Sequence, residues 1–156
     1  MVAAATMTRI VRWLACGFGA GNVPLIPGTV GTLWGVVLAA ALAPLPVGHF
    51  VIVTIVFVVF AAWLADQALP QFDSRDPKAI VVDEVAGYLV TLVGHGWSGG
   101  LALLAFVLFR LFDIGKPPPC RRLERLPGGV GIVADDVMAG LYANGLLWII
   151  KGWFSI

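Results

Sequence analysis

Apolar residues gather into five segments along the chain, and most polar residues lie between them. The segments are residues 29–43, 47–65, 79–94, 101–112 and 131–150. Residues 47–65 carry one His and no formal charge, and as a helix they would span about 28 Å, the thickness of a bilayer's hydrocarbon core. The pattern predicts an all-α, polytopic helical membrane protein with about five apolar helical segments, some short enough to pack inside the bundle.

The stretches between these segments have their own character. Arg9 and Arg12 interrupt any early apolar run, so residues 8–16 are expected to form a short N-terminal interfacial helix with Trp13 at the headgroup level. Pro44 and Pro46 predict one tight turn, and the glycine-rich residues 96–100 predict another. Residues 66–79 and 113–129 are expected to be polar connections. Residues 1–156 are expected to form a single membrane domain.

The composition supports a lipid-facing surface. The chain is 60% hydrophobic and 12% charged, whereas a soluble domain carries roughly 25% charged residues. A net charge of +1 without a clustered basic face argues against a nucleic-acid partner. Cys16 and Cys120 are too few for a disulfide framework and lack metal-ligand spacing. The oligomeric state is left open by the sequence.

The basic residues predict an orientation. If the N-terminus is cytoplasmic and all five segments cross, nine of the ten Lys and Arg residues lie inside and only Lys151 lies outside. This bias follows the positive-inside rule. The inside residues are Arg9, Arg12, Arg75, Lys78, Arg110, Lys116, Arg121, Arg122 and Arg125.

With this orientation, five acidic residues converge at the inner interface: Asp83, Glu84, Asp113, Asp135 and Asp136. An isolated Asp would cost about 2.5–3.5 kcal/mol at mid-bilayer and less near the interface. Five carboxylates also repel one another, so bound divalent metal, basic partners or both must offset them. Mg²⁺ suits such a set because it binds a few carboxylates together with substrate phosphate and water. An acidic pair at a helix start could alternatively complement the helix dipole.

Helix geometry refines the expected metal site. Neighbouring helical residues point about 100° apart, so only one residue of each adjacent acidic pair is expected to ligate an ion directly. Small residues follow the acids at four-residue spacing and would allow close helix packing. The two stripes are Asp83, Gly87 and Thr91, and Asp136, Gly140 and Asn144.

Two stretches on the same side are candidates for phosphate binding. Residues 17–32, GFGAGNVPLIPGTVGT, could hold an anion through backbone N–H groups near Thr29 and Thr32, although such a loop could simply turn. Residues 110–122, RLFDIGKPPPCRR, could clamp a phosphomonoester or contact anionic headgroups. His49 and His95 fall at the outer end and are expected to have no catalytic role.

Four blocks resemble the signature of the phosphatidylglycerophosphatase A family: PLIPGTVGT (24–32), DPKAIVVDEVAG (76–87), FRLFDIGKPPP (109–119) and GGVGIVADDVMAG (128–140). The resemblance implies Mg²⁺-dependent removal of the terminal phosphate of phosphatidylglycerophosphate, giving phosphatidylglycerol. It also implies a place in the bacterial cytoplasmic membrane, with the active site on the cytoplasmic side. The implied catalytic residues are Asp83, Glu84, Asp113, Lys116, Asp135 and Asp136, and the five acids among them are the implied metal ligands. The implied phosphate-binding residues are Arg110, Pro27, Gly28, Thr29, Gly31, Thr32, Lys78 and Arg121.

Alternatives remain at this stage. The nucleophile could be a water molecule or an Asp carboxylate. A small cation or proton transporter could also use buried carboxylates, but it would distribute them across the bilayer rather than at one interface. A structural membrane subunit would have no need for clustered acids.

Overall fold

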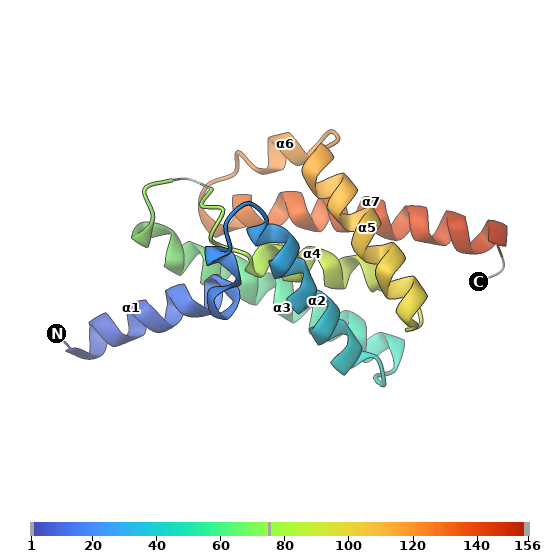
Figure 1. Ribbon diagram of the computed structural model, residues 1–156, viewed down its shortest axis with the longest axis horizontal. Helices are drawn as coiled ribbons and strands as arrows, with labels where there is room; N and C mark the ends of the chain where they lie inside the picture. Colours follow the sequence, from blue (N-terminus) through green and yellow to red (C-terminus); the bar gives the residue numbers. More distant parts are fainter. Residues whose placement is uncertain (1, 75, 155–156) are drawn as a thin grey trace.

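The computed structural model describes residues 2–74 and 76–154, with the side chains of residues 2–5 and 154 excepted; Arg75 of the predicted inner face lies outside this set. The described chain is all helical and contains no strand, as predicted (Figure 1). The elements are α1 (Val2–Ala15), the 3₁₀ helix η1 (Gly17–Asn22), α2 (Pro27–Leu42), α3 (Val47–Ala68), η2 (Leu69–Gln71), α4 (Val82–Leu92), α5 (Gly99–Gly115), α6 (Cys120–Leu123) and α7 (Gly128–Phe154).

Each apolar segment forms one helix, with ends that follow local chemistry. α2 begins at Pro27, two residues before the predicted start, because proline fits the first helical turn, where its missing N–H is not needed. α5 begins earlier because Ser98 caps it, its hydroxyl accepting a hydrogen bond from the Leu101 N–H at 3.2 Å. The predicted polar connection 113–129 contains the short helix α6, which hydropathy alone did not indicate.

Two helical stretches, Val47–Gln71 and Gly128–Trp153, are long and apolar enough to cross a membrane. α2 is apolar but shorter. Large apolar side chains on α3, including Ile52, Ile55 and Val59, are exposed on its outer face. A protein in water would bury more of such a surface, so these faces suit contact with lipid.

α4 is the central helix of the bundle. Ten of its 11 residues are buried, Glu84 being only partly exposed, and it packs against α2, α3, α5 and α7. At 11 residues it is about 16 Å long, too short to cross a bilayer alone. It is therefore one of the short segments expected to pack inside the bundle.

Glycines bring α4 and α7 into backbone contact, as the two predicted stripes required. A Cβ on Gly140 would collide with the carbonyl oxygen of Gly87. A Cβ on Gly87 would lie 2.7 Å from the carbonyl oxygen of Asp136. One turn further on, the amide Nδ2 of Asn144 donates to the carbonyl oxygen of Thr91 at 2.9 Å. The stripes therefore face each other, and this contact sets Asp83 opposite Asp136.

The Gly87→Ala substitution should destabilise the bundle by about 1–3 kcal/mol, because the added methyl group would overpack the crossing of α4 and α7. Thermal unfolding of the purified protein in detergent measures the effect. Gly145→Ala, on α7, is the matched control, since an added Cβ there meets nothing within 4 Å. Equal melting temperatures for the two variants would contradict the proposed tight crossing.

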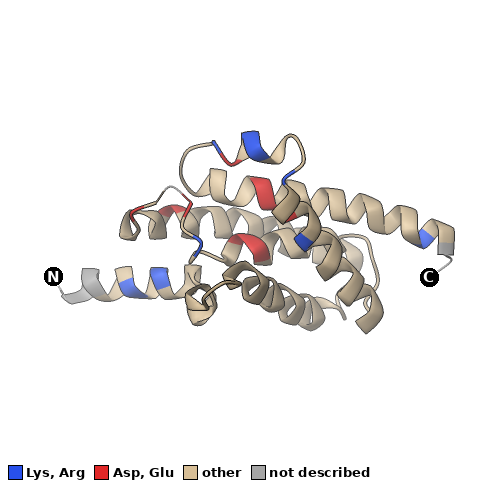
Figure 2. Cartoon of the chain, turned by 45° about the horizontal axis from the view of Figure 1, so that its top comes forward, with Lys and Arg blue, Asp and Glu red and all other residues tan. Residues whose placement is uncertain are grey.

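The start of α2 is held against the start of α4 in the same way. A Cβ on Gly31 would lie 2.6 Å from the Cβ of Val81, and one on Gly35 would lie 2.9 Å from the Cβ of Tyr88. The N-terminal turns of α2 and α4 and the first half of α7 therefore meet in one region. Figure 2 shows most of the coloured charged segments around this region and the neighbouring loops, apart from the blue segments on the helix at the N-terminus and the blue segment close to the C-terminus.

Candidate active site

A cavity of about 520 Å³ lies where α2 and α4 begin and α5 ends. It receives side chains from α2, α4, α5, α7 and the loop before α4. Most of the sequence-predicted site residues line it: Pro27, Gly28, Thr29, Lys78, Asp83, Glu84, Arg110, Asp113, Lys116, Asp135 and Asp136. Residues separated by more than 100 positions in the sequence therefore share one cavity.

Asp83, Glu84 and Asp136 form a three-carboxylate cluster in this cavity. Each offers one oxygen, and the three oxygens all lie within 4.8 Å of one another. Only one residue of the adjacent pair Asp83 and Glu84 was expected to face an ion, but both bring an oxygen to the same cluster. Both lie in the first turn of α4, directly after the non-helical Val81, and the longer Glu side chain can reach back beside its neighbour.

The carboxylate cluster has unused hydrogen-bonding capacity. Asp83 Oδ1, Glu84 Oε2 and Asp136 Oδ2 are buried and have no hydrogen-bond partner. Buried polar atoms in folded proteins almost always have partners, and an unpaired buried carboxylate oxygen costs free energy. Three carboxylates that bring an oxygen together from two helices, and that each keep one buried oxygen without a partner, fit a bound cation with hard oxygen ligands.

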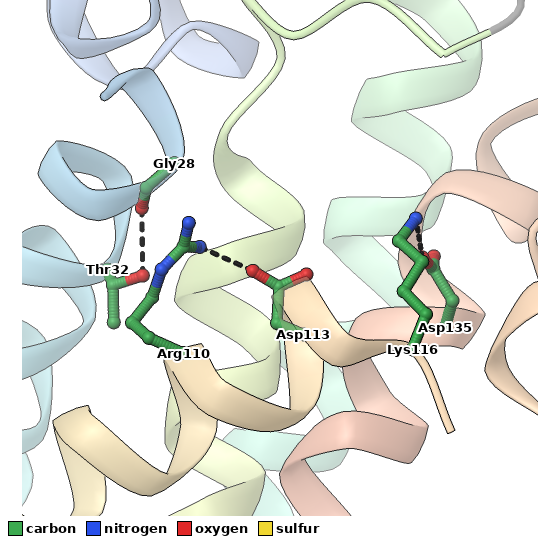
Figure 3. A network of polar contacts seen from close by, with 6 residues as sticks. All are labelled: Gly28, Thr32, Arg110, Asp113, Lys116 and Asp135. Carbon is green, nitrogen blue, oxygen red and sulfur yellow. Dashed lines mark hydrogen bonds and ion pairs between the residues drawn. The ribbon is translucent and has the colours of Figure 1, made fainter. Parts of the chain in front are cut away.

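Asp113 and Asp135 each have a basic partner instead (Figure 3). Arg110 Nη1 donates a hydrogen bond to Asp113 Oδ2, one turn along α5. Lys116 Nζ donates to Asp135 Oδ2 at 2.7 Å. These two acids therefore line the cavity as members of ion pairs, and Asp113 also contacts Asp136 of the three-carboxylate cluster.

Lys116 joins three segments of the chain. It ends α5 in a left-handed backbone conformation, with φ at 44°. Its Nζ also lies 3.1 Å from Glu124 Oε2, just after α6. Burial by itself lowers the pKa of Lys116, but the hydrogen bonds and charges of Asp135 and Glu124 outweigh it and raise this pKa above its usual value. Lys116 thus remains a cation at neutral pH, suited to binding anions rather than to releasing a proton.

Sequence reasoning did not assign Asp76 and Glu124 to the site. Asp76 lines the cavity, and burial raises the pKa of its carboxyl, an effect that the nearby Lys116 charge partly offsets. Asp76 opens the second signature block, so the block itself was a signal. Glu124 had none, because its role depends on α6 folding back toward Lys116.

Three predicted phosphate-binding residues do not line the cavity. Thr32 is buried and its hydroxyl donates to the Gly28 carbonyl at 2.8 Å (Figure 3). Gly31 packs against Val81. Arg121 lines a second, neighbouring cavity of about 800 Å³, which shares Asp76 and Lys116 with the first. Thr32 and Gly31 therefore help to hold the first turns of α2 in place without lining the cavity.

Gly28 is held between two charged groups. A Cβ at this position would collide with Glu84 Oε1 and would lie 2.9 Å from Arg110 Nη1. The backbone at the start of α2 therefore contacts both the carboxylate cluster and the guanidinium. By ordinary helix geometry, the first N–H groups of α2 lack intrahelical acceptors and are available to an anion.

His49 and His95 do not line the cavity. The His95 ring lies 4.5 Å from the Trp148 ring, near the start of the loop between α4 and α5. Both histidines therefore lie away from the charged groups of this cavity.

A family model and two of the three similar proteins named below carry the same description. The model of the family described as phosphatidylglycerophosphatase A matches residues 13–151. An Escherichia coli phosphatidylglycerophosphatase A is 34% identical over 88% of this chain and 81% of its own length. A Haemophilus influenzae protein of the same name is 37% identical over 92% and 90%. A Bacteroides thetaiotaomicron protein, named provisionally as a phosphatidylinositol-3-phosphatase, is 37% identical over 88% and 93%. No solved structure matches the chain.

Proposed function

Since the chain belongs to the phosphatidylglycerophosphatase A family, we propose that it hydrolyses the terminal phosphate of phosphatidylglycerophosphate to give phosphatidylglycerol and inorganic phosphate. The observation that carries the proposal is the cavity itself, in which three unpaired carboxylate oxygens lie beside Arg110 and the start of α2. Opposite charges in one cavity suit a cation and a phosphomonoester bound together.

Asp83, Glu84 and Asp136 would hold Mg²⁺, and Asp113 would lie beside it. When bound, the ion would neutralise phosphate oxygens and either activate a water molecule or orient the phosphorus. The carboxylates themselves would keep the ion on the α4–α7 side of the cavity. Because two of them come from one helical turn, the third must be positioned by the glycine crossing of α4 and α7.

The phosphate would be bound from the opposite side. Arg110 reaches the Gly28 backbone, so its guanidinium and the N–H groups at the start of α2 can bind neighbouring oxygens of one anion. Lys78 and Lys116 line the same cavity and add positive charge. These donors would stabilise the charge that develops on the equatorial oxygens during transfer.

The proposed function also includes a membrane location. We place the chain in the bacterial cytoplasmic membrane, with α3 and α7 crossing it and α2, α4 and α5 completing a multi-pass bundle. The cavity would open on the cytoplasmic side. Support comes from the nine basic residues assigned to that side and from the apolar outer face of α3.

Phosphate release from the purified protein in detergent tests the proposal. We expect Mg²⁺-dependent turnover of phosphatidylglycerophosphate, and loss of turnover on chelation with EDTA. Phosphatidylinositol 3-phosphate should be assayed in parallel, because one relative is named for that activity. The proposal is abandoned if no lipid phosphomonoester is hydrolysed, and cation flux through proteoliposomes without hydrolysis would favour the transporter alternative.

The Lys116→Ala substitution should raise KM for the lipid about tenfold, because a charged hydrogen-bond donor near the phosphate is lost. The Mg²⁺ concentration for half-maximal activity should change little, since Lys116 pairs with Asp135 and not with the carboxylate cluster. Steady-state titrations of lipid and Mg²⁺ separate the two effects. Lys151→Ala is the control, and an effect on Mg²⁺ alone would contradict the assigned role.

A further inference from the structure

Three exposed apolar side chains lie at the mouth of the charged cavity. Leu25, Ile26 and Ile114 all line it, and they are 98%, 52% and 71% exposed. Two precede α2 and one lies near the end of α5. These three residues are named the apolar lip.

The backbone conformation of Leu25 adds to the free-energy cost of exposing the lip to water. Leu25 has a φ of 73°, in the left-handed region that a residue with a Cβ rarely adopts and that costs on the order of a kilocalorie per mole. The strained conformation does not bury the Leu25 side chain but presents it outward almost fully exposed. Hydrocarbon around the lip would account for that exposure.

The lip continues two exposed apolar stripes. On α5, residues at spacings of four, four and three share one helix face and are all exposed: Leu103, Val107, Leu111 and Ile114. On α2 and its N-cap, Ile26, Leu33 and Val37 repeat the pattern at spacings of seven and four. Both stripes end at the cavity, so apolar surface and charged interior meet at the lip.

We propose that the apolar lip bears the diacylglycerol part of a phospholipid whose acyl chains stay in the bilayer along α2 and α5. Only the headgroup passes over the lip, toward Lys78 and Arg110. This inference rests on the proposed function and names what selects its substrate. The lip favours membrane lipids over water-soluble phosphomonoesters, because binding remote from the phosphate can be used to hold the reacting group in place.

Activity on two substrates tests the proposal. The double variant Leu25→Ser with Ile114→Ser should reduce kcat/KM for long-chain phosphatidylglycerophosphate in mixed micelles about tenfold or more, because two apolar contacts are lost. Activity on the deacylated headgroup phosphate should be unchanged. Ile55→Ser, an exposed α3 position that does not line the cavity, is the matched control and should match wild type on both substrates.

The outcomes separate this inference from the proposed function. Unchanged activity of the double variant on the long-chain lipid would overturn the proposed role of the lip. An equal loss on both substrates would also overturn it, because such a loss would indicate damage to the cavity. A wild-type protein inactive on the lipid overturns the proposed function and the substrate role of the lip with it.

A measurement without turnover tests where the lip lies. Nitroxide labels on Leu25→Cys and Ile114→Cys in vesicles should collide with oxygen more often than with a water-soluble nickel complex. Ile55→Cys should behave in the same way, and Asp73→Cys, exposed in the loop after η2, should show the reverse preference. Aqueous accessibility at both lip positions would overturn the proposal.

Discussion

The Asp136→Asn substitution should reduce kcat by about 10²–10³-fold without unfolding the protein. Asn keeps nearly the shape of Asp, so the packing of α7 on α4 should persist. The change removes one of three carboxylates that converge within 4.8 Å. Two remaining acids from a single turn of α4 cannot enclose an ion from both sides. Phosphate release under saturating lipid and Mg²⁺ measures the loss.

The effect of the Asp136→Asn substitution on the melting temperature can also be predicted. Without divalent cations, the three clustered carboxylates repel one another, so neutralising one should leave the melting temperature unchanged or raise it. A drop in melting temperature that accompanies the loss of activity would instead indicate a structural role for Asp136. Asp73→Asn, on an exposed loop, is the matched control and should retain full activity.

The Gly28→Ala substitution should reduce kcat/KM by about 10²-fold through a single methyl group. The added Cβ would collide with Glu84 Oε1 and press on the Arg110 guanidinium at 2.9 Å. Both groups would have to move, and a shift of about 1 Å at a reacting centre can cost that much in rate. Ala is otherwise favourable in a helix, so secondary structure should be retained.

The control for this variant is Gly48→Ala, near the start of α3, where an added Cβ meets nothing within 4 Å. It should match wild type in activity. Raising Mg²⁺ should not rescue Gly28→Ala fully, because the guanidinium is displaced as well as the carboxylate. Wild-type activity for Gly28→Ala would show that the start of α2 does not approach the reacting groups.

Much of this arrangement could be predicted because long apolar helices can be recognised from composition alone. The five apolar segments each became a helix, and the four-residue spacing of Gly87 and Gly140 after their acids correctly predicted a close crossing. The convergence of acids followed from the positions of the segment ends. Such inferences depend only on local pattern and on the alternation of chain direction.

Other features depended on tertiary contacts that no local pattern encodes. Regular helix geometry excluded a shared site for Asp83 and Glu84, but both lie in a first turn that follows a non-helical residue. Which of the five acids form an ion pair depends on Arg110 and Lys116. The latter is oriented by the left-handed end of α5, so the sequence alone could not identify its partner.

Direct binding of Mn²⁺ to the purified protein in detergent, followed by electron paramagnetic resonance without substrate, tests the central claim. Wild type should bind the ion, and Asp83→Asn, Glu84→Gln and Asp136→Asn should each weaken binding at least about tenfold. Asp135→Asn, whose carboxylate pairs with Lys116, should bind nearly as wild type does. Equal affinity in all four variants and wild type would contradict a cation site built from the three carboxylates.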